Sequence, residues 1–414
     1  MKIRQAPFFM QESFKETVKA KFQSMKSVED LADLLNYVYR NAVRPPQGGT
    51  GMKLFNPRKV IHVDARILMY YGHFLKTGGG YHTFQIMKKS GGIREIAAPK
   101  YTLKVIQRCL VEILYCLYED HKAANGFVPG RSIASNAKNH FGKRYVLNID
   151  IKDFFPSTRF GRIRKVLTFR PFNLQEDRLP IATLVASLCC RNGALPQGAP
   201  TSPVISNIVC RQMDARLADI ARKYKAYYSR YADDLTFSAN TDVFNEDFKR
   251  QVTEILSVQG YEINQEKYRL QDWKQRQEVT GLVVNKKVNV ERQYIKDVRY
   301  WLHVWQKFGM VAAQTDFLKK FLKKKGFLRY NGKTVPLANY LRGKLLFLNM
   351  IRGKEDKLFE KLNATFESLL GSKEYPQKVR ELEHSLHQMF EIWERGGIEE
   401  AKAFYQRNII TNGR

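Results

Sequence analysis

The sequence predicts an α+β domain followed by a basic helical domain. Strand-like and helix-like patterns alternate from about residue 52 to about residue 290. Beyond about residue 290 the pattern changes to long helices with dense positive charge, as in FLKKFLKKKGFLRY at 317–330, and a mixed-charge helical stretch covers 373–408. A chain of 414 residues is long enough for two or three domains with a large buried core.

The single elements are predicted from their local patterns. Residues 1–45 follow the helical period, and PPQGGTG at 45–51 breaks it, which predicts a linker or an exposed loop. KSGGIREIAAP at 89–99 predicts a hairpin that ends at its proline, and LKVIQRCLVEILYCLY at 103–118 predicts an amphipathic helix. RYVLNIDIKDFFPS at 144–157 predicts a buried strand that runs into a turn.

The charge of the chain indicates a polyanionic partner. Lys and Arg number 70 against 40 Asp and Glu, so the net charge is +30 and the isoelectric point is about 9.8. Self-repulsion on this scale opposes compaction unless a polyanion shares the charge, which favours nucleic acid. An anionic membrane is the competing partner, but the sequence has no apolar run of membrane-spanning length, no signal peptide and no lipidation motif. We therefore expect no membrane partner.

The cysteines argue against a zinc site and against a disulfide framework. Their number is odd and no C-x-x-C spacing occurs among them. A reducing cytoplasm is the compartment that suits such a set. Core packing is the favoured interpretation for the two cysteines that share the helix at 103–118. The five are Cys109, Cys116, Cys189, Cys190 and Cys210.

Two adjacent carboxylates stand out in the stretch SRYADDLTFSA at 229–239. Asp233 and Asp234 form the only Asp-Asp pair in the sequence. The flanks, Ala226–Tyr228 and Leu235–Phe237, have the aromatic and β-branched character of strands, so Tyr231 to Asp234 are expected at the tip of a hairpin. A solvated turn is the alternative interpretation, because Asp is common in turns.

A third carboxylate belongs with this pair. Asp150 follows the apolar run from Tyr145 to Ile149, where an acid costs free energy unless something neutralises it. Two strands that bring Asp150 beside the Asp-Asp turn would make an oxygen-ligand site suited to Mg²⁺. Such a site serves phosphoryl or nucleotidyl transfer through two metal ions about 3.5–4 Å apart. Asp153 is assigned to structure, because strand side chains alternate between faces and Asp153 lies nearer the turn.

Five sequence blocks in order resemble the fingers and palm motifs of reverse transcriptases. They are GGIREIAAP, NIDIKDFFPS, ALPQGAPTSPVISNIVCRQMD, YSRYADDLTFSA and VTGLVVN, and they cover roughly residues 85–290. The resemblance implies a right-hand polymerase fold, in which fingers and palm with an RRM-like antiparallel sheet precede an α-helical thumb. It divides the chain into an N-terminal helical extension at 1–50, fingers and palm at 51–290, a basic thumb at 291–370 and a C-terminal helical extension at 371–414.

The resemblance also implies roles for single residues at the metal site. Asp150, Asp233 and Asp234 match the catalytic, metal-binding carboxylates, and the backbone carbonyl of Ile151 matches an extra ligand. The implied cofactors are two Mg²⁺ ions, for which Mn²⁺ can substitute. Lys267 lies where the family's palm can carry a lysine that protonates the leaving pyrophosphate; a solvated lysine is the alternative.

Three more positions match nucleotide-binding residues of the family. Phe155 matches the bulky gate beneath the incoming sugar, where an aromatic ring would exclude a 2′-hydroxyl and favour dNTPs. Gln197 matches a residue that contacts the nucleotide. Arg94 matches the fingers residue on the triphosphate, and a guanidinium suits phosphate through bidentate, charge-assisted hydrogen bonds. A core aromatic is the alternative for Phe155, and a surface charge is the alternative for Arg94.

Val279, Thr280 and Gly281 match the hairpin that grips the primer end; an ordinary strand turn is the alternative. The same VTG and the NAKNH at 136–140 resemble two signatures of retron reverse transcriptases. Asn136 and His140 are therefore predicted to bind RNA, and a core or capping histidine is the alternative. The last predicted RNA contacts are lysines of the thumb that would follow the template-primer phosphates. They are Lys319, Lys320, Lys323 and Lys324, and a solubilising face is the alternative.

The retron resemblance implies a bacterial, cytoplasmic protein that acts in anti-phage defence. Retron enzymes bind a structured noncoding RNA, prime from a 2′-hydroxyl of a guanosine in it, and copy part of it into a branched RNA–DNA molecule. The implied partners are that RNA, its cDNA and an effector protein encoded nearby. Two alternatives stay open: a defence-associated reverse transcriptase with other priming and repetitive or unbranched cDNA, and a noncatalytic scaffold that binds RNA or an effector. A group II intron protein is disfavoured, because no zinc-binding endonuclease pattern follows the thumb.

Overall fold

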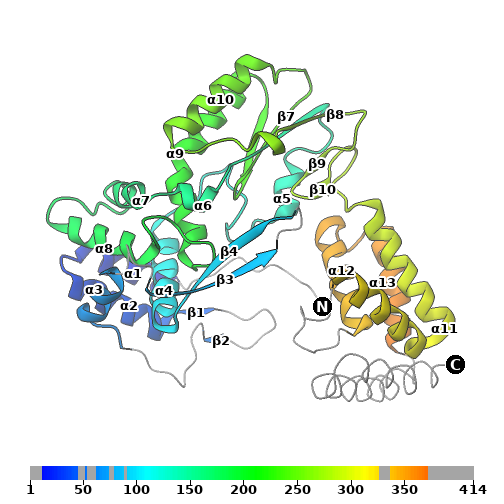
Figure 1. Ribbon diagram of the computed structural model, residues 1–414, viewed down its shortest axis with the longest axis horizontal. Coiled ribbons are helices and arrows are strands. Elements are labelled where there is room, and N and C mark those ends of the chain that lie inside the picture. The colour runs from blue at the N-terminus through cyan, green and yellow to red at the C-terminus, as the bar shows by residue number, and fades with distance from the viewer. Residues whose placement is uncertain are drawn as a thin grey trace. The chain divides into compact units, whose positions relative to one another are not determined.

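The computed structural model describes residues 12–44, 52–53, 62–73, 79–87, 91–325 and 336–371 (Figure 1). The chain divides into two compact units, Met1–Lys286 and Lys287–Arg414. The predicted linker at 45–51 and the predicted tail helix at 373–408 lie outside the described residues. The division into fingers, palm, thumb and extensions stays a prediction.

A four-stranded antiparallel sheet carries the predicted buried strand at its centre. The strand order is β6-β7-β5-β8, so β5 has hydrogen-bonded neighbours on both sides. Its apolar residues Val146, Leu147 and Ile149 are no more than 1% exposed. The antiparallel sheet of the predicted fold is confirmed. The four strands are β5 (Tyr145–Asp150), β6 (Tyr227–Tyr231), β7 (Asp234–Ala239) and β8 (Arg269–Asp272).

The two faces of this sheet have different environments because strand side chains alternate. Leu147, Leu235 and Phe237 point to the face that α9 (Thr201–Lys223) and α10 (Glu246–Val258) cover, and they share one apolar core with residues of both helices (Figure 1). By the same alternation, the register partners Asp150 and Asp234 point to the opposite face. Their carboxylates are therefore kept out of the apolar core.

Short elements pack along that opposite face. The helix α5 (Ile133–Lys138) lies against β6 and against the small hairpin formed by β9 (Glu278–Val279) and β10 (Leu282–Val283). Asn148 of β5 donates to the carbonyl of Glu278 at 3.0 Å, which ties the small hairpin to the sheet.

A helical layer surrounds the second apolar core of the first unit. The helix predicted at 103–118 is present as α4, and its buried residues pack with those of the other helices. The segment at 89–99 belongs to a hairpin, as predicted, but it supplies only the second strand. There β4 (Ile93–Pro99) pairs with β3 (Tyr81–Met87), so the hairpin begins earlier than expected, at Tyr81. The five cysteines are buried, and within the described residues none of them forms a disulfide. The helices of this core are α1 (Glu12–Ser24), α2 (Val28–Asn41), α3 (Ala65–His73), α4 (Tyr101–Leu117), α7 (Phe160–Leu167), α8 (Leu179–Cys189) and the first part of α9, from Val204 to Val209.

The second unit is helical. Gly309, at φ 80° and ψ 171°, breaks the regular helix inside α11. Trp301 and Phe317 of α11 and Phe366 of α13 are each less than 5% exposed and form its apolar interior. No helix in the described part of the chain is long and apolar enough to cross a membrane. The helices are α11 (Arg292–Lys325), α12 (Leu337–Arg352) and α13 (Lys357–Leu370).

The remaining elements are short. They are the strands β1 (Val43–Arg44) and β2 (Met52–Lys53), the helix α6 (Phe154–Ser157) and the 3₁₀ turns η1 (Glu176–Arg178) and η2 (Gln265–Lys267).

Candidate active site

The Asp-Asp pair lies at a tight hairpin between β6 and β7, as predicted, but the turn is shorter than expected. Tyr231 and Asp234 are paired strand residues, so only Ala232 and Asp233 form the turn. Ala232 has φ 58°, in the left-handed region that a two-residue hairpin requires. The carbonyl of Asp233 accepts a hydrogen bond from the amide of Ile151 at 3.0 Å, which joins the turn to the end of β5.

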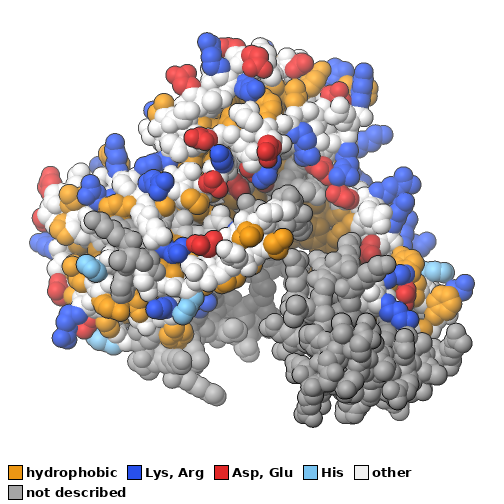
Figure 2. Space-filling model, viewed as in Figure 1, with side chains coloured by type: hydrophobic (Ala, Val, Ile, Leu, Met, Phe, Trp, Pro, Cys, Tyr) orange, Lys and Arg blue, Asp and Glu red, His pale blue; other side chains and the backbone are white. Residues whose placement is uncertain are grey.

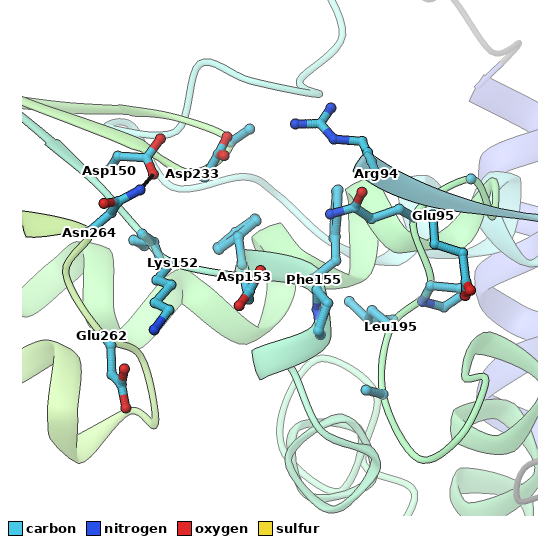
Figure 3. A pocket seen from close by; sticks show the side chains of 18 of the residues that line it. Arg94, Glu95, Asp150, Lys152, Asp153, Phe155, Leu195, Asp233, Glu262 and Asn264 are labelled. Carbon is cyan, nitrogen blue, oxygen red and sulfur yellow. Dashed lines mark hydrogen bonds between the residues drawn. The ribbon is translucent and has the colours of Figure 1, made fainter. Parts of the chain in front are cut away.

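Three carboxylates meet where β5 ends beside this turn. Asp150 is directly opposite Asp234 in the strand register. Asp150 and Asp233 line a cavity of about 1200 Å³, and Asp150 and Asp234 line a second cavity of about 380 Å³. Figure 3 shows the carboxylates of Asp150 and Asp233 beside the same open space. Asp150 is only 6% exposed and stands at the junction of both cavities.

The carboxylates raise one another's affinity for protons. The surrounding protein removes part of the water around Asp234, which still borders solvent, and this desolvation together with repulsion from Asp233 and Asp150 raises its pKa to about 7. Desolvation and the charge of Asp150 also raise the pKa of Asp233. A divalent cation would offset this repulsion, and carboxylate oxygens are the ligands that Mg²⁺ prefers.

Two side chains hydrogen-bond to the Asp150 carboxylate, and one of them, Lys267, brings a positive charge. The ammonium of Lys267 donates to Oδ1 at 2.8 Å, and Asn264 Nδ2 donates to Oδ2 at 3.3 Å (Figure 3 shows the second contact). Within the described residues no three His, Cys, Asp or Glu side chains already stand in a metal-holding arrangement. Because Lys267 remains 58% exposed, it can leave Asp150 toward solvent when another cation arrives.

The three predicted nucleotide-binding residues line the same 1200 Å³ cavity. Arg94 projects from β4 toward the space in front of the carboxylates, and Phe155 lies between it and Asp153 in the view of Figure 3. The loop of Gln197 is fixed to β4, since the Gln197 carbonyl accepts from the amide of Ala97 at 2.7 Å. The next residue must be glycine, because a Cβ on Gly198 would lie 2.8 Å from the Ala97 carbonyl oxygen. The geometry therefore brings these residues together; their roles stay predictions.

Comparisons with known proteins agree with this arrangement. Residues 86–284 match the family described as reverse transcriptase (RNA-dependent DNA polymerase). The retron Ec86 reverse transcriptase of Escherichia coli is 32% identical over 241 residues, which cover 58% of this chain and 72% of that protein. The chain belongs to the retron reverse transcriptase family. The fold class predicted from the sequence, an α+β right-hand polymerase, is confirmed.

Other retron reverse transcriptases match over less of their length. The Mx65 and Mx162 enzymes of Myxococcus xanthus are 38% and 34% identical over 54% and 55% of this chain. These matches span 55% and 53% of the two relatives, so the chain covers about half of their length. Among solved structures, apo telomerase from Candida tropicalis has a TM-score of 0.40 and 11% identity over 80% of this chain and 65% of that chain.

A buried ion pair supports the Asp-Asp turn of this retron-type chain, and the sequence analysis did not find it. Arg230 and Asp214 both have fully buried side chains. Arg230 Nε donates to Oδ1 at 2.8 Å and Nη2 donates to Oδ2 at 2.7 Å, a bidentate pair. Its Nη1 donates to the carbonyl of Ala232 at 3.2 Å. The helix α9, which carries Asp214, thereby fixes the turn that carries Asp233.

Two residues of the retron signature NAKNH, Asn136 and His140, belong to a buried polar chain. Asn136 and His140 are 0% exposed. Ser229 Oγ donates to Asn136 Oδ1 at 2.7 Å, so His140 Nε2, 2.6 Å from the same hydroxyl, is the donor to Ser229, and His140 Nδ1 accepts from Ser238 at 2.7 Å. This geometry favours the alternative of a core histidine that braces β6 and β7, because neither side chain is free to touch RNA.

Burial of His140 makes an acid-sensitive contribution to stability. Desolvation lowers the pKa of His140 from 6.5 to about 3, whereas the unfolded chain protonates near 6.5. The stabilisation is therefore complete above about pH 6.5 and is lost by about 1.4 kcal/mol per pH unit as the pH falls toward 3. We expect denaturant unfolding of wild-type protein to lose about 2 kcal/mol between about pH 6.5 and pH 5 from this residue.

The matched variant for this prediction is His140→Gln. It should be less stable at neutral pH, and its stability should fall less between the two pH values than that of the wild type. An equal pH dependence of the free energy of unfolding in both proteins would contradict the assignment.

The second retron signature, VTG, is attached to α5, the helix that carries Asn136. Thr280 Oγ1 donates to the carbonyl of Ile133 at 3.2 Å, which attaches the β9–β10 turn to the start of α5. Thr280 and Gly281 have φ values of 49° and 77°, and both line the 380 Å³ cavity with Asp150. Val279, the residue before this turn, is 0% exposed and anchors the hairpin in the protein interior. The turn is thus placed beside the carboxylates, and its role as a primer grip stays a prediction.

The predicted lysine contacts lie on α11 in the second unit. Lys319 is exposed. Lys320 forms an ion pair with Asp316 at 2.9 Å, and its ammonium lies 4.4 Å from the ring centroid of Tyr300. Part of its positive charge is therefore neutralised by partners on the same helix. The side chains of Lys323 and Lys324 lie outside the described residues.

Proposed function

We propose that the protein is an RNA-directed DNA polymerase that copies a cognate structured noncoding RNA into single-stranded DNA. The observation that supports it is the single 1200 Å³ cavity, lined by carboxylates and by Arg94, Phe155 and Gln197, in a chain of the retron reverse transcriptase family. The net charge of +30 also suits the binding of a polyanionic template.

The donor set fits two Mg²⁺ ions. Asp150, Asp233, Asp234 and the carbonyl of Ile151 would hold them, and Mn²⁺ could substitute. The ions would supply activation of the primer hydroxyl and neutralisation of phosphate charge. Desolvation and repulsion among the carboxylates raise the pKa of Asp234, and a divalent cation would relieve that repulsion.

The chain's own residues bind and orient the substrates. Arg94 would contact the triphosphate of a dNTP, and the ring of Phe155 would exclude a 2′-hydroxyl. Thr280 and Gly281 would hold the primer end at the smaller cavity. Lys267, 2.8 Å from Asp150, would be released toward the leaving pyrophosphate and would carry a proton to it.

The biological assignment follows the family. We propose a bacterial cytoplasmic enzyme whose product is a branched RNA–DNA molecule, and whose partners are its template RNA and an effector protein encoded nearby, in defence against phage. Other priming with unbranched cDNA and a noncatalytic RNA scaffold are the competing possibilities.

Two measurements test the proposal. Purified protein with an annealed primer on an RNA template, dNTPs and Mg²⁺ should extend the primer, and chelation of the metal should stop extension. Nucleic acid that co-purifies with the protein should contain a discrete single-stranded DNA joined to one RNA through a link that a debranching enzyme cleaves. Unbranched or repetitive DNA would contradict the retron-type product and favour a defence-associated enzyme with other priming. Bound RNA without any primer extension would favour the noncatalytic scaffold.

A further inference from the structure

Phe127 is an aromatic residue beside the nucleotide cavity to which neither the sequence motifs nor the family match gives a role. It lies in the loop between α4 and α5, lines the 1200 Å³ cavity and is 37% exposed. Its ring centroid is 6.1 Å from that of Phe155, with an angle of 34° between the planes. Phe155 has a second ring neighbour, the buried Phe154, at 5.4 Å. Phe127 is therefore the solvent-side support of the sugar gate.

The backbone of Phe127 is held in a conformation that phenylalanine disfavours. Its φ of 62° is in the left-handed region, which costs free energy for a residue with a Cβ. Tyr115 of α4 donates to the Phe127 carbonyl at 3.2 Å, and Asn207 of α9 donates to the carbonyl of Gly126 at 3.0 Å. Strain that several elements impose together is a mark of functional positions.

The same segment is attached to the catalytic hairpin. The amide of Arg230 donates to the carbonyl of Ala123 at 2.8 Å, and the amide of Asn125 donates to the carbonyl of Arg230 at 2.7 Å. A Cβ on Gly126 would lie 2.4 Å from the amide nitrogen of Ala232, so the two backbones touch. The position of the Phe127 ring is thus fixed relative to the turn that carries Asp233.

We propose that Phe127 determines sugar specificity by holding Phe155 against the 2′ position of the incoming nucleoside triphosphate. A gate ring rejects a 2′-hydroxyl only while it cannot move away, and the ring of Phe127, which contacts that of Phe155, would limit this movement. The inference rests on the proposed polymerase function and deepens it. It adds a residue that acts through Phe155 and whose own ring need not touch the substrate.

The Phe127 ring also faces a second cavity, which suits a different ligand. Phe127 also lines a cavity of about 280 Å³ with Tyr115, Pro200, Pro203 and Arg108. Flat apolar side chains beside an arginine suit an unpaired template base. The contact with Phe155 favours the sugar gate, and the test below separates the two roles.

The experiment compares dNTP and rNTP incorporation by the full-length protein in single-nucleotide primer extension on an RNA template. Phe127→Asn removes the ring and keeps a residue that tolerates the left-handed backbone, so strain is not added. Phe127→Tyr keeps the ring. Phe169→Asn, at an exposed phenylalanine after α7, is the matched control. We expect Phe127→Asn to lower the ratio of dNTP to rNTP kcat/KM by about ten-fold, through KM for the nucleotides, while Phe127→Tyr and Phe169→Asn keep the wild-type ratio.

Each other outcome overturns the inference in a distinguishable way. A parallel fall in kcat for both nucleotide classes, with the ratio unchanged, would give Phe127 a purely structural role. A raised Kd for the RNA template with the ratio unchanged would assign the ring to the template. Absence of extension by the wild-type protein would overturn the proposed function itself, and the inference with it.

Discussion

The double variant Asp233→Asn/Asp234→Asn should lose DNA synthesis by at least about 1000-fold, because it removes two of the three carboxylates that would hold the metal ions. RNA binding should remain close to that of the wild type, since neither side chain contributes to a positive surface. Primer extension and a binding titration at matched salt concentration measure the two properties. Asp219→Asn, at an exposed carboxylate on α9 that pairs with Arg222, is the control and should extend primers normally.

The same double variant has a second expected signature. The pKa of Asp234 is raised above its unfolded value, so its ionisation lowers the stability of the folded protein as the pH rises through about 7. Removing that charge should leave the metal-free protein at about pH 8 as stable as the wild type or more so. A loss of activity that coincides with a lower melting temperature would indicate misfolding instead, and retained synthesis would contradict the assignment of the site.

Asp214→Asn should destabilise the first unit by about 3–5 kcal/mol, because it leaves the guanidinium of Arg230 buried without its partner charge. Both side chains are fully buried, so water cannot replace the lost carboxylate. The free energy of unfolding in urea measures the loss. Asp219→Asn again serves as the comparison, because its ion pair is exposed and contributes little.

A second variant separates stability from positioning at this pair. Asp214→Leu/Arg230→Met replaces both charges by apolar side chains of similar size, which should restore most of the stability. It also removes the hydrogen bond from Arg230 to the Ala232 carbonyl. We therefore expect a stable protein with reduced kcat. Full recovery of both stability and kcat would show that the ion pair does not position the turn.

The sequence predicts most of the elements that carry the site, because local pattern decides them. The aromatic and β-branched flanks of the Asp-Asp pair predict the hairpin, and the apolar run before Asp150 predicts the central strand. Their pairing is nonlocal, since β5 and β7 are far apart in the chain. The resemblance to reverse transcriptases is what predicted that these two strands meet. The same resemblance predicted that Lys267 lies near the carboxylates.

The supporting contacts are harder to predict. Arg230 belongs to a strand whose neighbours on the same face are apolar, and an arginine on such a face signals a buried partner; that signal does not show that the partner is Asp214 on α9. Phe127 follows a glycine in a loop, where no periodicity operates. The NAKNH signature predicted RNA contacts for Asn136 and His140. Both side chains instead form buried hydrogen bonds with Ser229 of β6, and a short sequence motif does not show which of its residues are buried.

The central place of β5 sets how the site can move. Beyond the strand's last pairing, the amide of Ile151 still donates to Asp233, and the carbonyl of Asp150 accepts from the amide of Asn264 at 2.8 Å. Backbone amides enclosed on both sides open only with the whole domain, so those of β5 should exchange with deuterium most slowly. We therefore expect the three carboxylates to form one rigid platform, and motion during turnover to fall to the β3–β4 hairpin. That hairpin carries the exposed residues Met87 and Ile93, and hydrophobic side chains lie at its place in the view of Figure 2.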